Sequence, residues 1–140
     1  MSTRIRPEIT NNSIYYISRH RYYELKHFCM QYPDWKHELS VLDGISSRSA
    51  GTGEHINTGK VGKPTEVYAE ARMFFEKRIQ MIDDAATRAT DDIFGKVLVM
   101  AVINEMSYEQ VAARGLTNYG KDLWYAAYRR FFWILDKTRK

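Results

Sequence analysis

The last third of the chain is rich in side chains that can recognise a base pair or a phosphate. From Ser107 to Lys140 there are seven lysines and arginines against three acids, an excess that equals the formal net charge of the whole chain, +4. Arginine and lysine donate to guanine O6 and N7, asparagine pairs in two ways with adenine, and aspartate accepts from cytosine N4. This concentration of charge favours a nucleic-acid partner for this segment.

Helical spacing divides these side chains into two groups. Five polar residues on one side of the predicted helix are candidates for reading base edges: Asn118, Lys121, Asp122, Tyr125 and Arg129. The N-terminal part of a recognition helix normally reaches the bases, which is where these five lie. Four basic residues follow later and are expected to contact phosphates: Arg130, Lys137, Arg139 and Lys140. Phosphate contacts add salt-dependent affinity without sequence preference.

Two predicted helices position these residues. Ser107 and Gln110 have capping-box spacing, which predicts a short helix from Ser107 to about Arg114. Gly115 can adopt the left-handed backbone that ends a helix, and Thr117 or Asn118 can cap the next one. That longer helix is expected from Asn118 to about Lys137. Together they predict a helix-turn-helix.

The predicted core side of the longer helix is an apolar stripe. Four residues recur at helical spacing: Leu123, Ala127, Phe131 and Ile134. The aromatic run of residues 131–133 exceeds what one helix can bury alone, so it requires cover from the N-terminal helices or from a second copy of the chain.

Earlier parts of the chain predict more helices. Residues 1–44 read as an N-terminal arm followed by a helical hairpin, with Ser18 capping its first helix and Gly44 ending its second. Residues 45–64 hold four glycines and read as a flexible linker. Residues 65–140 begin with a long central helix to about Thr87, followed by a helix from about Asp91 and the helix-turn-helix. The predicted fold class is therefore all-α.

The string Ser107-Tyr108-Glu109-Gln110-Val111-Ala112 resembles the opening helix of the region-4 helix-turn-helix of sigma factors and of sigma-like phage regulators. The strings YYISRHRYYELKHFCMQYPDWK and YAAYRRFFWIL resemble small prophage proteins of Firmicutes grouped with RinA- or ArpU-like regulators. The resemblance implies control of late phage transcription, with RNA polymerase as a candidate partner. The turn GLTNYG is longer than the usual one, and no segment resembles the sigma region that melts promoters. An activator, a repressor or a sigma-like accessory protein therefore fits better than a complete sigma factor.

Three other features of the sequence are weaker indications of function. GEHINTGKV, residues 53–61, departs from a phosphate-binding loop in its glycine spacing and ends in Val61 instead of a hydroxyl residue. His20, Glu24 and His27 share a helix face, but such residues more often form a solvated surface than a zinc site. Cys29, the single cysteine, is expected in the core. We therefore expect no cofactor, no metal and no enzymatic activity.

These observations predict a double-stranded DNA-binding phage or prophage transcriptional regulator. No segment approaches the length of a membrane span or a signal sequence, so we expect a cytoplasmic protein of a bacterial host cell, without a membrane partner. A homodimer is expected. Two alternatives remain: a DNA-packaging protein resembling a small terminase, and a phage-encoded protein-interaction module that inhibits a host protein.

Overall fold

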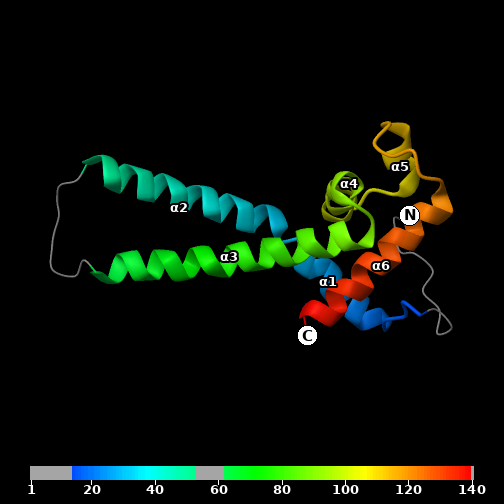
Figure 1. Ribbon diagram of the computed structural model, residues 1–140, viewed down its shortest axis with the longest axis horizontal. Coiled ribbons are helices and arrows are strands. Elements are labelled where there is room, and N and C mark those ends of the chain that lie inside the picture. Colours follow the sequence, from blue (N-terminus) through cyan, green and yellow to red (C-terminus); the bar gives the residue numbers. More distant parts are fainter. Residues whose placement is uncertain (1–13, 53–61, 140) are drawn as a thin grey trace. The chain divides into compact units, whose positions relative to one another are not determined.

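The computed structural model describes the backbone of residues 14–52 and 62–139, and the side chains of 14–44 and 66–139. Every regular element in these ranges is a helix, which confirms the all-α prediction (Figure 1). In chain order they are α1 (Arg19–Cys29), α2 (Tyr32–Thr52), α3 (Gly62–Ala89), α4 (Asp92–Ile103), α5 (Tyr108–Ala113) and α6 (Lys121–Arg139). The long central helix and the long C-terminal helix both match the prediction.

The chain forms two compact units whose limits differ from the expected divisions. Met1–Gln31 and Met81–Lys140 form the first unit, and Tyr32–Gln80 forms the second. Helix α1, expected as the first helix of the N-terminal hairpin, therefore belongs with the C-terminal helices, and the hairpin of the second unit is made by α2 and the first part of α3. The reason lies in α1, whose apolar side chains pack with α4 and α6.

The expected stop at Gly44 is wrong, because α2 continues to Thr52. A glycine inside a helix costs only about 1 kcal/mol relative to alanine, so it weakens a helix without ending it. Residues 45–52 and 62–64 of the expected linker are consequently helical. The rest of that linker, and the expected arm at residues 1–13, lie outside the described residues.

Side-chain caps define the starts of three helices, and the sequence predicts two of them, at Ser18 and Ser107. Ser18 and Asp91 accept hydrogen bonds from the backbone amides three residues later, at the starts of α1 and α4. Ser107 and Gln110 form the reciprocal capping box at the start of α5. Each cap satisfies an amide that has no partner inside the helix.

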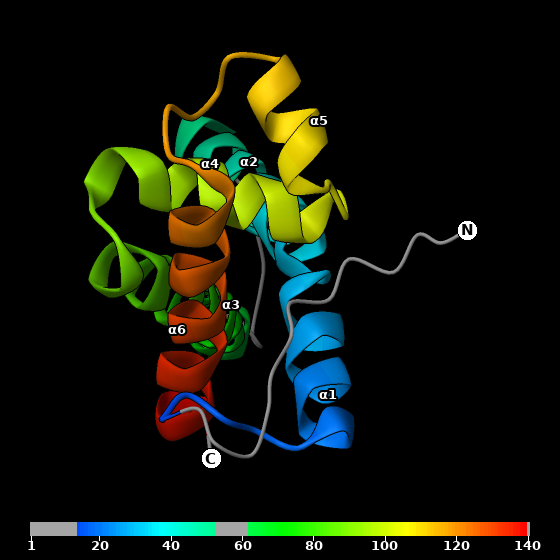
Figure 2. The same ribbon diagram turned by 90° about the vertical axis from the view of Figure 1, so that its right-hand side faces the viewer.

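The aromatic core of the first unit is built around α6, which packs against α1 and α5 (Figure 2). Phe131 and Phe132 are both fully buried, and the ring of Tyr22 on α1 meets that of Phe132 edge-on, 5.0 Å between centroids. Tyr15 contacts Trp133 in the same way at 5.5 Å. Residues from the start of the chain therefore cover the aromatic run of α6 within one copy of the protein.

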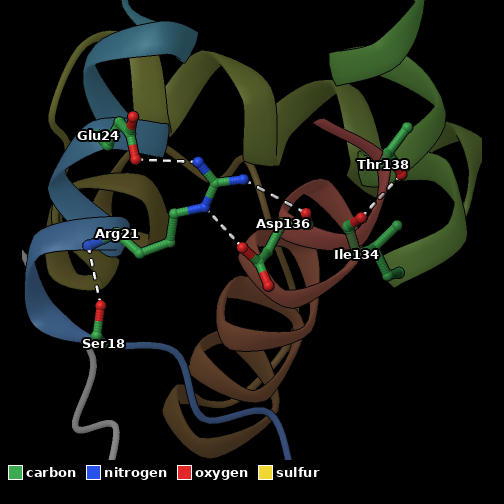
Figure 3. Close-up of polar contacts among 6 residues, drawn as sticks. All are labelled: Ser18, Arg21, Glu24, Ile134, Asp136 and Thr138. Atoms are coloured by element: carbon green, nitrogen blue, oxygen red, sulfur yellow. Dashed lines mark hydrogen bonds and ion pairs between the residues drawn. The ribbon is translucent and has the colours of Figure 1, made fainter. Parts of the chain in front are cut away.

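A charged hydrogen-bond network also joins α1 to α6 (Figure 3). The Nε of Arg21 donates to Oδ1 of Asp136 at 2.6 Å, and an η nitrogen donates to Glu24 at 2.9 Å. These acceptors, Asp136 foremost, raise the pKa of Arg21 above its usual range. Only about a quarter of each side chain of the Arg21–Asp136 pair is exposed, so this contact lies at the edge of the aromatic core.

Two ionisable groups are enclosed in that core. Cys29 has no exposed surface, and burial raises the pKa of its thiol well above the usual range. Burial likewise raises the pKa of Tyr128, and the neighbouring Tyr22 adds to the effect. Both groups therefore remain neutral at physiological pH, as the expected core position of Cys29 requires.

The second unit is a helical hairpin in which α2 and the first part of α3 run side by side (Figure 1). Arg72 of α3 forms ion pairs with Asp43 of α2 and, at 3.3 Å, with Glu76 of its own helix. Two apolar side chains of α3, Val67 and Phe74, are 56% and 47% exposed.

Candidate nucleic-acid interface

The segment from Ser107 to Arg139 contains a short helix, a turn and a long helix. Helix α5 is only six residues long, and the capping box fixes its start. Its end is set by Gly115, whose φ of 68° lies in the left-handed region, as predicted. The amide of Leu116 donates to the carbonyl of Val111, which closes the end of α5.

The start of α6 differs from the prediction. The helix begins at Lys121, and the carbonyl of Gly120 accepts its first hydrogen bond from Trp124, so Gly120 holds the capping position. Thr117 does not cap α6, because its hydroxyl accepts from the amide of Tyr119 within the turn. Asn118 is therefore an exposed turn residue three positions before the helix.

Two tyrosines hold the turn in place. The hydroxyl of Tyr108 on α5 donates to the carbonyl of Tyr119 at 2.7 Å, and the Tyr108 amide donates to the hydroxyl of Tyr125 on α6 at 3.2 Å. The hydroxyl of Tyr119 is 2.6 Å from that of Thr90, and its ring lies against Phe94 on α4. The long turn is thus tied to α5 and α4, and α5 is in turn tied to α6.

Sequence reasoning did not identify Tyr108 and Tyr119 as positioning residues. Their aromatic character alone gave no sign of this role, because Thr90 is 29 residues distant from Tyr119 along the chain. A tyrosine within a turn, flanked by small and polar residues, is the one signal in the sequence that could have suggested an anchor.

Four predicted contact residues lie on the solvent side of α6. Lys121, Asp122 and Arg130 are exposed, and Arg129 is partly exposed. Lys121 is paired at 3.2 Å with Glu109 of α5, but both side chains remain more than 60% exposed. The backbone amide of Glu109 and the Lys121 ammonium together lower the pKa of Glu109. Within the described residues, Arg129 and Arg130 form no ion pair.

Two other predicted residues, Tyr125 and Arg139, have surroundings that differ from those expected, whereas Lys137 is exposed as expected. Tyr125 is only partly exposed because its hydroxyl accepts from Tyr108, so it has a structural role. The guanidinium of Arg139 lies 4.1 Å from the centroid of the Phe28 ring and its Nε is buried, which removes it from the expected phosphate contacts. Lys137 is exposed and lies over the Trp133 ring. Lys140 is outside the described residues.

Two of the helices in the first unit carry an exposed apolar side chain. Leu123, predicted as a core residue, is 62% exposed, and Ile93 on α4 is 72% exposed. The other three residues of the predicted stripe, Ala127, Phe131 and Ile134, are buried as expected. Leu123 alone of the four lies on the solvent side, next to Lys121 and Asp122.

Comparison of the chain with protein-family models, with curated proteins and with solved structures finds no match. Among the residues whose side chains are described, no cluster of three or more histidine, cysteine or acidic side chains could hold a metal ion. None of the described helices combines the length and the apolar character required to cross a bilayer.

Proposed function

We propose that this protein binds double-stranded DNA through α6 and acts as a phage or prophage transcriptional regulator. The observation that carries the proposal is the solvent-facing side of α6, where Lys121, Asp122 and Arg129 lie within three turns of the helix start. These residue types supply donors for guanine and phosphate and an acceptor for cytosine.

The anchored turn supports this assignment. A recognition helix must enter the major groove in a defined orientation, and a supporting helix has to hold it there. Helix α5 contacts α6 through the Tyr108–Tyr125 hydrogen bond and the Glu109–Lys121 ion pair. A DNA phosphate could replace Glu109 as the partner of Lys121, because both side chains are exposed and an exposed pair is worth little.

Contact roles follow from position along the helix. The residues that we propose to read base edges are Lys121, Asp122 and Arg129. Asn118, which lies in the turn, is proposed to contact the DNA backbone. Arg130 and Lys137 are the proposed phosphate contacts, since they are exposed and lie further along α6. Leu123 is available for the methyl group of thymine, an apolar contact that base recognition commonly uses.

The test compares Arg129→Glu with Lys96→Glu, a matched charge reversal at an exposed residue of α4 in the same unit. Fluorescence anisotropy with duplexes selected from a random library measures affinity. We expect Arg129→Glu to weaken binding roughly 10- to 100-fold, the range of one good base contact, and Lys96→Glu to have a much smaller effect. If the two variants weaken binding equally, the affinity depends only on the net charge of the protein, and the assignment of Arg129 to base reading is contradicted.

Salt dependence supplies an independent measurement. Each phosphate contact contributes about −0.9 to the slope of log affinity against log salt concentration. Arg130→Gln should therefore make the slope shallower by about 0.9 while leaving the selected sequence unchanged. A changed sequence preference would reassign Arg130 to base reading, and selection that yields no duplex bound above background would reject DNA binding.

The exposed side chains of Ile93 and Leu123 favour a second candidate, a protein-interaction module that binds a host protein. The double variant Ile93→Ser with Leu123→Ser distinguishes the two. Loss of a nuclease-resistant host partner with unchanged DNA affinity would favour the interaction module, whereas reduced DNA affinity without a captured partner favours the DNA-binding proposal.

A further inference from the structure

One side of α3 in the second unit carries apolar residues that the hairpin leaves uncovered. Val67 and Phe74 are seven residues apart and therefore lie almost in line, with the partly exposed Ala71 between them. We call these three residues the α3 stripe. The side of α3 that meets α2 is a different one, because it carries Arg72, which contacts Asp43.

Arg78 extends this stripe by one turn. Its guanidinium lies 3.6 Å from the centroid of the Phe74 ring and donates to the Phe74 carbonyl at 3.0 Å. Phe74 nevertheless remains 47% exposed. The arginine therefore covers one face of the ring and leaves the remainder available for contact with another surface.

The charges beside the stripe are arranged in two blocks. Glu66 and Glu70 lie toward the N-terminal end of this part of α3, and Lys77 lies toward its C-terminal end. All three are exposed, and none of them forms an ion pair within the described residues. By contrast, Arg72 and Glu76 on the hairpin side are already paired with each other.

We propose that the α3 stripe is a dimer interface in which a second copy of this chain packs its own α3 antiparallel to the first. A twofold axis midway between Ala71 and Phe74 places each Phe74 beside the second copy's Ala71. Because Glu70 and Lys77 are seven residues apart, they flank the stripe on the same side. The axis brings Lys77 within about two residues of the second copy's Glu70 along the helix, an axial offset of about 3 Å.

Charge selects the antiparallel arrangement. In a parallel pair, whose twofold axis runs along the helices, the charged flank of one copy lies on the opposite side of the stripe from that of the other, so Glu70 and Lys77 gain no partner of opposite charge. In the antiparallel pair, Lys77 instead lies between the second copy's Glu66 and Glu70, and Arg78 lies beside Glu66. The same surface is then complementary to itself, as a twofold interface requires.

The stripe is short, so the dimer is expected to be weak. Stable interfaces bury on the order of 800 Å² per partner, and three side chains supply only part of this area. We expect dissociation in the micromolar range, which is measured by sedimentation velocity of the full chain over about 1–200 µM without DNA. Because no DNA is present, the outcome is independent of the proposed DNA-binding function.

The first comparison uses two neighbouring residues of α3. Phe74→Gln should raise the dissociation constant at least tenfold, whereas Met73→Gln, the same uncharged change at a residue that is 61% exposed but off the stripe, should change it little. Equal effects of the two variants, or a wild-type chain that is monomeric throughout the range, would overturn the proposal. So would assembly into a ring in place of a dimer.

The second comparison exchanges charges and does not depend on the apolar variants folding. Lys77→Glu should weaken the dimer because it places Glu beside Glu70, and the double variant Glu70→Lys with Lys77→Glu should restore it. All of these residues are exposed, so the far-ultraviolet helical signal should be unchanged. A Lys77→Glu variant with wild-type affinity, or a double variant that is no better than the single one, would refute the antiparallel pairing.

Discussion

The hydrogen bond between Arg21 and Asp136 offers a quantitative test of how α1 and α6 are held together. The perturbation is a double-mutant cycle with Arg21→Met, Asp136→Asn and the combined variant. Arg21→Met keeps much of the aliphatic length and removes the donors, while Asp136→Asn keeps the shape and removes the charge. The cycle isolates the free energy of the pair from the other contacts of each residue.

The geometry sets the expected magnitude. The Nε–Oδ1 distance is 2.6 Å, a second donor lies 3.5 Å from the Asp136 carbonyl, and the two side chains are 24% and 26% exposed. Hydrogen bonds to charged groups contribute about 1.5–3 kcal/mol, and fully exposed ion pairs about 0.2–1 kcal/mol. With a quarter of each side chain in water, we expect a coupling free energy of about 1–1.5 kcal/mol, between these two ranges.

The assay is urea unfolding followed by tryptophan fluorescence in a Trp35→Phe background. Trp124 and Trp133 both lie on α6, so the remaining signal reports on the first unit. Arg21→Met should destabilise slightly more than Asp136→Asn, because it also breaks the exposed contact with Glu24. A coupling free energy below about 0.3 kcal/mol, the usual error of additivity, would refute the attachment of α1 to α6 through this pair.

Two further predictions concern close packing and burial. Gly95→Ala should destabilise the protein by about 1–3 kcal/mol in thermal or urea unfolding, because a Cβ at this position would lie 3.1–3.2 Å from backbone atoms of Ala86 and Thr87. Alanine normally stabilises a helix relative to glycine. A stabilised variant would therefore contradict the close contact between Gly95 and these backbone atoms. The raised thiol pKa of Cys29 means that the folded state retains a proton which the unfolded state loses above about pH 8.5. The free energy of unfolding should therefore be unaffected by this group below that pH and fall as the pH rises beyond it. Cys29→Ser should remove that part of the decline. Rapid reaction of the native thiol with a disulfide reagent at pH 8 would contradict its burial.

Much of the local structure could be predicted from the sequence because the interactions that create it span three or four residues. Ser18, Asp91 and Ser107 each cap a helix by accepting from an amide three positions later, and Gly115 ends α5 through its own backbone conformation. Such contacts do not depend on the rest of the fold.

The candidate site depended more strongly on contacts between distant residues. The start of α6 moved from Asn118 to Lys121, where Gly120 provides the first carbonyl and Tyr119 is held by Thr90 across the fold. Leu123, which was expected in the core, is exposed, and Arg139, which was expected at a phosphate, lies against Phe28. Periodicity alone did not distinguish these faces, because it does not tell which neighbour a broad stripe will meet.

Sequence by itself therefore determined the helical class, two helix caps, the glycine turn and the concentration of positive charge near the C-terminus. Tertiary structure alone decided that α1 covers the aromatic face of α6, that α2 pairs with α3, and which basic side chains of α6 remain in water. The physical reason is that a cap or a turn is a local hydrogen-bond arrangement, whereas burial and pairing are decided by which surfaces meet when the whole chain folds.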